Sequence, residues 1–498
     1  MTTFANHVSP YIGSRAVGRV GKIVGVRPLA SGAGRVSVDN GDEPEDRGQR
    51  RTSRLATRGT ISGVSLRAQG ARLSAPLRSP LFSNAYALIA NTGITAFLGF
   101  AYWVAAARLL DAATVGLAAA ALSALTLLSG LAQLNLEAVM VRFVPVSGSR
   151  TFNLVRSVYG ISAGTAAAAA IVFLLGVDAW TPALSFLRRD IAWALWFVVA
   201  TVAWVLFVLQ DGILVGFGRA LWIPVENAAF GVAKLALLLV LATGGGAGAI
   251  ILSSTIPIVL VVLPVSALIF WRLIPAHTRA SATLNVSGPK DVRGIARYAA
   301  GDYLGRLCEL ASEAMLPLIV TRSAGSADNA FFYQSWTIAY TLRLIVHNMT
   351  SPLTARAARD PAHLERDGRL VFIHTLRLVA AGAAILIVGS PLILAVFGPD
   401  YAVGVPALRL LALSAIPSTI ILLGLTVARV RDHIGEVIAI QAVTAVLVLG
   451  SSVVLVQSHA GTGVAAGWLG SQSLVALVLL ATRLRWLVRP TITQPTAA

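Results

Sequence analysis

Long apolar runs separated by short polar stretches make up most of the chain after residue 80. Each run reaches the roughly 20 residues that a helix needs to cross the hydrocarbon core of a bilayer. Because lipid offers the backbone no hydrogen-bond partners, every run is predicted to be helical. The pattern predicts about 12 transmembrane helices, at residues 82–107, 113–140, 153–177, 191–215, 222–242, 249–273, 297–320, 329–352, 371–397, 403–427, 435–457 and 463–484. The runs at 297–320 and 329–352 contain charges and have the weakest hydropathy signal.

The basic residues in the predicted loops alternate along the chain. If the N-terminal segment is cytoplasmic, the even-numbered loops and the C-terminal tail carry 17 Arg and Lys residues. The odd-numbered loops carry only 4, namely Arg108, Arg188, Arg189 and Arg322. Cytoplasmic loops are enriched in Lys and Arg, so both termini are predicted to be cytoplasmic. An extra or missing helix would disturb the alternation, which therefore also supports the helix count.

The chain is predicted to consist of two six-helix lobes. The longest central loop divides six helices from six, and the 34-residue spacing of Arg108 and Arg142 recurs at Arg322 and Arg356. Two parallel six-helix repeats are a known transporter plan. We expect a disordered basic cytoplasmic tail at 1–80, an N-lobe at 81–273, a cytoplasmic linker at 274–296, a C-lobe at 297–486 and a C-terminal tail at 487–498.

Composition narrows the class of protein further. The 498 residues have a mean hydropathy of +0.75, and only 12% are charged, which is too little charge to cover a soluble protein of this size. The net charge of +18 sits between apolar runs and in one tail, which favours orientation and contact with membrane lipids over nucleic acid. The preference for arginine over lysine suggests a GC-rich bacterium and hence a bacterial inner membrane. The single cysteine, Cys308, allows no intramolecular disulfide.

Ionisable residues inside the predicted spans are functional candidates, because an unpaired charge in a bilayer is costly. Asp302, Arg306, Glu309 and Glu313 recur at helical spacing and share one face of the seventh helix. The eighth helix presents Trp336, Tyr340, Arg343 and His347 on one face, and Arg409, Glu226 and Lys234 lie on the tenth and fifth helices. These residues predict a polar central cavity. The alternative is a set of internal salt bridges that only hold the bundle together.

The mixture of charges suggests a division of roles. Arginines supply bidentate donors that suit an anionic lipid diphosphate, and carboxylates suit proton or ion coupling. The predicted substrate-contacting residues are Arg306, Arg343, Arg409, Gln334 and Tyr340. The predicted coupling or gating residues are Asp302, Glu309, Glu313, His347, Glu226 and Lys234. The sequence contains no phosphate-binding loop, metal-binding His/Cys cluster or serine-nucleophile motif, so we expect no enzymatic activity, metal or cofactor.

Three stretches of the sequence resemble the polysaccharide (O-antigen type) flippases of the multidrug/oligosaccharidyl-lipid/polysaccharide exporter superfamily. They are YWVAAARLLDAATVGLAAAALSALTLLSGLAQLNLEAVMVRFVP at 102–145, LQDGILVGFGRALWIPVENAAFGVAKL at 209–235 and VFGPDYAVGVPALRLLALSAIP at 396–417. The likeness covers roughly residues 80–490. Its motifs are degenerate and identify a superfamily better than a substrate.

The resemblance implies two lobes forming a V around a central cavity that alternates between inward-open and outward-open states. The implied cargo is an undecaprenyl-diphosphate-linked oligosaccharide, moved from the inner to the outer leaflet for surface polysaccharide assembly. Arg108 and Arg142 match the family arginines that end the first and second helices and join the substrate-contacting candidates. Glycosyltransferases and a polymerase of the same pathway are expected partners.

Three other functions compete with this interpretation. A cation-coupled drug or metabolite antiporter would share the fold but favour carboxylates over arginines in the cavity. A major-facilitator transporter would carry an acidic-glycine-arginine signature after the second helix, which VRFVPVSGSRT at 141–151 lacks. A membrane polymerase or glycosyltransferase of glycan assembly would usually carry a sizeable catalytic loop, and none is evident.

Overall fold

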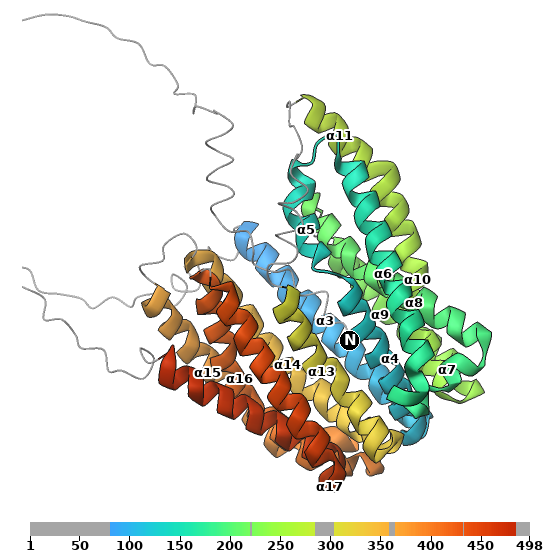
Figure 1. Ribbon diagram of the computed structural model, residues 1–498, viewed down its shortest axis with the longest axis vertical. Coiled ribbons are helices and arrows are strands. Elements are labelled where there is room, and N and C mark those ends of the chain that lie inside the picture. Colours follow the sequence, from blue (N-terminus) through green and yellow to red (C-terminus); the bar gives the residue numbers. More distant parts are fainter. Residues whose placement is uncertain (1–79, 220–221, 284–302, 358–363, 432, 485–498) are drawn as a thin grey trace, which may run out of the picture. The chain divides into compact units, whose positions relative to one another are not determined.

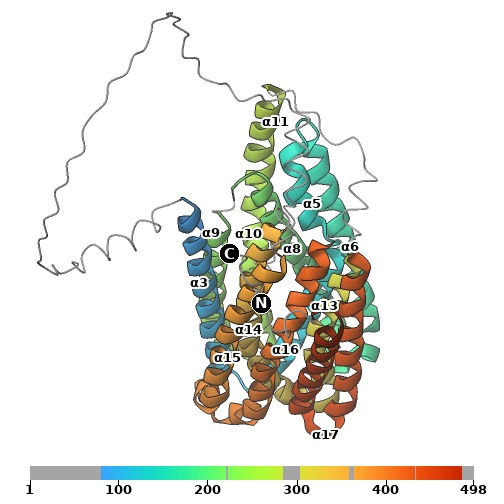
Figure 2. The same ribbon diagram turned by 90° about the vertical axis from the view of Figure 1, so that its left-hand side faces the viewer.

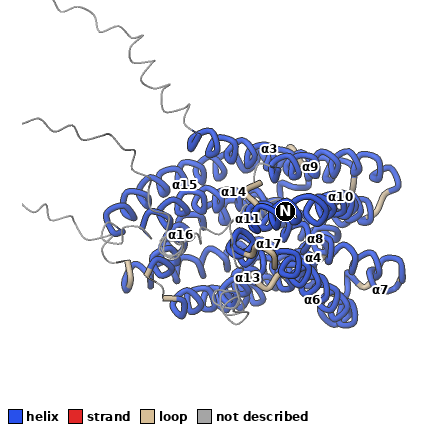
Figure 3. Tube along the Cα trace, turned by 90° about the horizontal axis from the view of Figure 1, so that it is seen from above, coloured by secondary structure: helices blue, strands red, loops and turns tan. Residues whose placement is uncertain are grey.

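The computed structural model describes residues 80–219, 222–283, 303–357, 364–431 and 433–484. These residues form helices joined by turns, and Figure 3 shows no strand among them. The described residues from Asn91 onwards belong to one compact unit. Residues 1–79 of the predicted tail at 1–80, most of the predicted linker (284–296) and the C-terminal tail lie outside the described residues.

The first six predicted helices are present in the first half of the chain. The long helices are α3 (Pro80–Leu109), α4 (Ala112–Ala132), α6 (Thr151–Trp180), α8 (Ile191–Gly216), α9 (Trp222–Leu241) and α10 (Ala247–Leu268). Shorter elements are α5 (Leu136–Phe143), η2 (Val144–Val146), η3 (Pro182–Leu184), α7 (Phe186–Arg189) and η4 (Ala242–Gly244). The sixth helix extends beyond its predicted end at 273, through η5 (Ile269–Leu273) into α11 (Ile274–Thr283), so part of the expected linker is helical.

The second half contains α13 (Tyr303–Ala324), α14 (Ser326–Ala357), α15 (Leu364–Ala395), η7 (Pro399–Gly404), α16 (Val405–Val430) and α17 (Ile434–Thr482). Eight described helices are long and apolar enough to cross a membrane by length and composition alone. Fewer of these helices lie in the second half, because α13 and α14 carry charges that lower their hydropathy. With α13, α14 and α3 included and α17 divided in two, the described helices match the twelve predicted spans.

Helix α17 is two helices joined by a sharp reversal. His459 (φ −135°) and Ala460 (φ 46°) are non-helical, and they separate the predicted eleventh and twelfth spans. The Oγ atoms of Ser451 and Ser471 lie 3.2 Å apart, so the two segments run back along each other. A Cβ on Gly463 would lie 2.1 Å from the Leu455 carbonyl oxygen, so this close return requires glycine.

The predicted second helix is broken near its end. Helix α4 ends at Ala132, and Leu134 and Asn135 take positive φ values of 49° and 56° before α5 begins. At its other end, α4 is capped by Asp111, whose carboxylate accepts hydrogen bonds from the Thr114 backbone N–H (2.9 Å) and hydroxyl (2.6 Å). These bonds, the hydroxyl first, hold the pKa of Asp111 below its usual value.

Helix packing brings the two halves together along α4. Within the first half α6 packs on α8, and within the second half α16 packs on α15 and α17, as Figures 1 and 2 show. Helix α4 packs against both α13 and α14 of the second half. One buried core therefore contains residues from both halves, including Tyr102, Leu122, Phe332 and Trp468.

Candidate functional site

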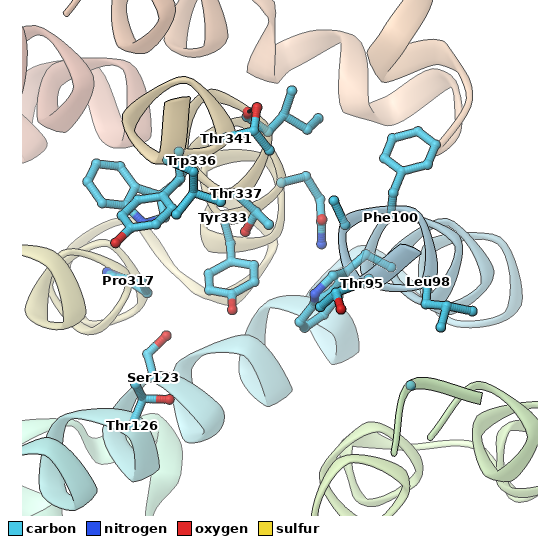
Figure 4. Close-up of a pocket in the computed structure, with 18 of the residues that line it drawn as sticks. Thr95, Leu98, Phe100, Ser123, Thr126, Pro317, Tyr333, Trp336, Thr337 and Thr341 are labelled. Carbon is cyan, nitrogen blue, oxygen red and sulfur yellow. Dashed lines mark hydrogen bonds between the residues drawn. The ribbon is translucent and has the colours of Figure 1, made fainter. Parts of the chain in front are cut away.

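A cavity of about 220 Å³ lies between α3, α4 and α9 of the first half and α13 and α14 of the second. Its walls are rich in aromatic rings and in short hydroxyl side chains. Figure 4 shows the lining residues, with Thr95 on α3, Ser123 and Thr126 on α4, and Tyr333 and Thr337 on α14. The cavity is smaller than the roughly 300–1,000 Å³ of typical ligand pockets, so a large ligand requires the halves to separate further.

Lys234 on α9 is buried in the wall of this cavity, with 6% of its surface exposed. Its Nζ lies 3.8 Å from the centre of the Tyr102 ring and 5.8 Å from that of Trp103. The Tyr102 hydroxyl is fixed by the Ile250 carbonyl (3.0 Å) and by Ser253 Oγ (2.8 Å). Among the described residues, Lys234 has ring contacts but neither an ion pair nor a hydrogen bond. A desolvated cation over an aromatic face gains about 2 kcal/mol or more, but the ring supplies no hydrogen-bond acceptor for the ammonium N–H groups.

One arginine and two glutamates of the second half form a buried cluster. Arg343 on α14 forms ion pairs with Glu313 (2.9 Å) and Glu309 (3.4 Å) of α13. Gln441 donates a second hydrogen bond to Glu309 (3.1 Å), and the Arg343 guanidinium lies 5.4 Å from the Trp468 ring centre. The bundle thus holds one arginine between two carboxylates, which is the internal salt bridge considered as the alternative to a binding role.

A second, smaller cavity of about 30 Å³ adjoins this cluster. Glu309, Arg343, Gln441 and Trp468 line it, together with hydroxyl and amide groups of the second half. Glu313 instead faces the larger cavity, as does Tyr340. The Arg343–Glu313 pair therefore separates the two spaces.

Three buried carboxylates lie apart from both cavities in the first half. Glu137, Asp211 and Glu226 are 4%, 1% and 8% exposed. Among the described residues, both oxygens of Asp211 and of Glu226 lack hydrogen-bond partners, and Glu137 accepts one bond from Gln133 (3.0 Å). Asp211 lies within electrostatic range of the other two carboxylates. A shared proton or cation would relieve the repulsion among them.

The structure places only part of the predicted site at the larger cavity. Gln334, Tyr340, Glu313 and Lys234 line it. Arg343 and Glu309 lie at the smaller cavity, and Arg306 and His347 are half-buried outside the lining of both. Glu226 belongs to the carboxylate group of the first half, and Asp302 lies outside the described residues.

Three arginines expected to contact substrate are exposed and lie elsewhere. Arg108 donates to the backbone of α15, and Arg142 lies at the end of α5, 5.6 Å from the Phe143 ring centre. Arg409 donates to the Ile387 carbonyl (3.2 Å) and to Ser390 Oγ (3.1 Å). Helix-end arginines cap carbonyl groups as readily as they face a cavity, and sequence position does not distinguish the two roles.

Several lining residues were not predicted, notably Thr95, Trp103, Ser123, Tyr333 and Thr337. They are uncharged, so the search for ionisable residues in apolar runs passed over them. A signal existed in α14, where Tyr333, Trp336, Thr337, Tyr340 and Thr341 recur at three- and four-residue spacing and all line the cavity.

No family model matches the chain, and no curated protein matches it. Solved structures do resemble it. A multidrug resistance MATE family transporter of the MOP superfamily matches in its inward-facing conformation with a TM-score of 0.60 and 16% identity, over 79% of this chain and 95% of that one. The outward-facing conformation of such a transporter matches with a TM-score of 0.57 and 16% identity, over 80% and 94% of the two chains.

A MOP superfamily transporter from Pyrococcus furiosus, described as having a binding pocket of reverse polarity, also matches. Its TM-score is 0.55 at 15% identity, over 81% of this chain and 95% of that one. At such low identity the likeness concerns the fold. The apolar helices and these matches together show that the chain is a multi-pass membrane protein with the fold of MOP superfamily transporters.

Proposed function

We propose that the protein is an alternating-access transporter that moves a polyprenyl-diphosphate-linked oligosaccharide from the inner to the outer leaflet of a bacterial cytoplasmic membrane. The fold likeness favours a transporter over a membrane enzyme of glycan assembly. The cavity is lined by both halves, so a relative movement of the halves would change its access. The loop charges orient both termini towards the cytoplasm.

The proposal of an anionic cargo rests on the surroundings of Lys234. A buried ammonium group without a carboxylate partner gains most from a ligand that brings its own negative charge. Among the described residues lining the larger cavity, the only other charged side chain is Glu313, which is already paired with Arg343. A diphosphate placed near Lys234 would therefore meet a cation for which no carboxylate of the described lining competes.

The uncharged lining suits the rest of such a cargo. Trp103, Tyr333 and Trp336 offer flat apolar faces to sugar rings and isoprenoid carbons, and Thr95, Thr126 and Thr337 offer hydroxyl groups to sugar hydroxyls. This assignment replaces arginine by lysine as the diphosphate-binding residue. Arg343 is instead assigned to holding α13 and α14 together, with Glu309, Glu313 and Glu226 as the proposed ion-coupling groups.

A second candidate function is that of a cation-coupled drug antiporter. The observation that favours it is Glu313, a carboxylate at the wall of the cavity. The multidrug transporters that match the fold add to its weight. In that case a cationic cargo would compete with Arg343 for Glu313, and Lys234 would oppose binding.

Reconstitution in proteoliposomes distinguishes the two candidates. We expect the wild type to move a labelled polyprenyl-diphosphate oligosaccharide across the bilayer, with Lys234→Gln at least ~10-fold slower at low substrate and Lys234→Arg close to wild type. Arg188→Gln, which removes an exposed arginine from outside the cavity, is the matched control. A wild type that ignores the lipid but exchanges a cationic dye against a pH gradient would establish the antiporter instead.

A further inference from the structure

Arg108 and Arg322 bridge the two halves of the protein in a reciprocal arrangement. Arg108 ends the first helix of the first half, and its Nε and Nη2 donate to the carbonyls of Val396 (2.7 Å) and Ala395 (3.0 Å) at the end of α15. Arg322 lies near the end of the first helix of the second half. Its Nη1 donates to the carbonyls of Ala179 and Trp180 (2.7 Å to the latter) at the end of α6.

The two bridges are equivalent in the two halves. Helices α6 and α15 are each the third helix of their half, so each arginine reaches from the first helix of one half to the third helix of the other. The last carbonyls of a helix lack intrahelical donors and carry partial negative charge. A guanidinium that donates to two of them satisfies both and places its charge favourably.

The same end of the molecule contains a close contact between α4 and α14. The Asn329 side chain of α14 donates to the Gly116 carbonyl of α4 (2.8 Å). A Cβ on Gly116 would lie 1.6 Å from the carbonyl oxygen of Ser326, so the two backbones touch at this position. The arginine bridges therefore lie at the same end as a close backbone contact between α4 and α14.

The opposite end of the interface is held differently. There the Tyr303 hydroxyl donates to the Leu131 carbonyl (2.5 Å), and Glu137 of the first half lies within electrostatic range of Arg306 of the second. Four bonds from charged donors join the halves at the arginine end, and bonds to charged groups are roughly twice as strong as neutral ones. Among the described residues, the hydrogen bonds between the halves that come from charged donors therefore lie at the arginine end.

We propose that Arg108 and Arg322 form a paired latch that closes the cavity on the side of the odd-numbered loops, and that both bridges must break before the cavity opens to that side. By the loop charges this is the outer side of the membrane. The latch follows from the contacts between the halves and does not depend on which cargo is carried. It gives these helix-end arginines a role in opening and closing rather than in binding substrate.

Distance measurement between spin labels tests the latch in the full-length protein. Labels at Ile191→Cys and Val403→Cys, two exposed positions on opposite halves at this end, report on the separation in a Cys308→Ser background. We expect Arg108→Ala/Arg322→Ala to raise the ratio of wide to narrow separations by roughly tenfold or more, and each single variant to do so by less.

Arg188→Ala is the matched control, because Arg188 lies at the same end but pairs with Asp178 of its own half. It should leave the distances unchanged. A double variant with the wild-type distribution, or a control that widens the separation equally, would overturn the latch. If the double alanine variant does not fold, the same distance measurement on Arg108→Lys/Arg322→Lys tests the latch. Lysine keeps the charge but lacks the fixed fork of donors, so a smaller shift in the same direction is expected, and no shift counts against the proposal.

Discussion

Replacing Arg343 by methionine should destabilise the protein rather than remove only a binding group. Arg343 stands between Glu309 and Glu313, at 3.4 and 2.9 Å. The three side chains are only 15%, 28% and 12% exposed, so solvent screens their interaction weakly. In Arg343→Met the two carboxylates would lose the ion-pair partner that they share.

The expected loss of stability can be worked out from the distance between the paired atoms. At 2.9 Å and an effective dielectric of about 20, the Coulomb attraction of the closer pair is about 6 kcal/mol, from which desolvation takes a large part. Removing one member of a buried ion pair typically costs roughly 3–5 kcal/mol, because the remaining charge is left uncompensated. For a protein of this size, that corresponds to a fall of roughly 5–10 °C in the melting temperature.

Thermal unfolding of the purified protein in one detergent measures this effect. We expect Arg343→Met to melt roughly 5–10 °C below wild type and Arg343→Met/Glu309→Gln/Glu313→Gln to regain most of the loss, because the triple variant removes both carboxylates together with the arginine that they share. Arg409→Met, an exposed arginine without a carboxylate partner among the described residues, should change the melting temperature little. A single variant as stable as wild type, or a triple variant no better than the single, would refute the reasoning.

Three further changes test the fold. Gly463→Ala should lower the melting temperature and expression because its Cβ would meet the Leu455 carbonyl at 2.1 Å, whereas Gly470→Ala, in open space, should not. Tyr102→Phe should cost roughly 1 kcal/mol in thermal unfolding by removing a buried hydroxyl from Ile250 and Ser253, and an unchanged melting temperature would show that these bonds add nothing. Asp111→Ala should cost about 0.5–2 kcal/mol through loss of the α4 cap. Because folding lowers the pKa of Asp111, its stabilisation is present above about pH 4 and is lost as the pH falls further, so melting curves of wild type and variant should converge in acid.

The sequence pattern predicted the helices well and their ends less well. Apolar runs of spanning length fix helices because the bilayer leaves the backbone no other partners. The break at Leu134 and Asn135 escaped this pattern, since both neighbouring segments remain apolar. The reversal at Ala460 was located as a boundary between two spans, although only the structure shows that Gly463 makes the close return possible.

Residues at three- and four-residue spacing lie on one side of a helix, which is why Glu309 and Glu313 were predicted to share a face of α13. In the structure both pair with Arg343 of α14. The sequence pattern could not predict which partner each charged side chain takes. The choice depends on distances between helices far apart in the sequence, and Arg343 could as well have faced a ligand as two carboxylates. Aromatic and hydroxyl residues that line the cavity carry no charge, and the sequence offers little to distinguish them from packing residues.

By itself, therefore, the sequence determined a polytopic bundle and the approximate position of its helices, since these depend on local hydropathy. It also predicts the orientation of the loops from the charge next to the membrane. Tertiary structure decided which charges pair with one another and which do not. It paired Arg343 with Glu309 and Glu313, joined Arg108 and Arg322 to helix ends of the opposite halves, and left Lys234 against an aromatic ring in the cavity wall. The physical reason is that the cost of a buried charge is set by its neighbours in space, and those neighbours come from other helices.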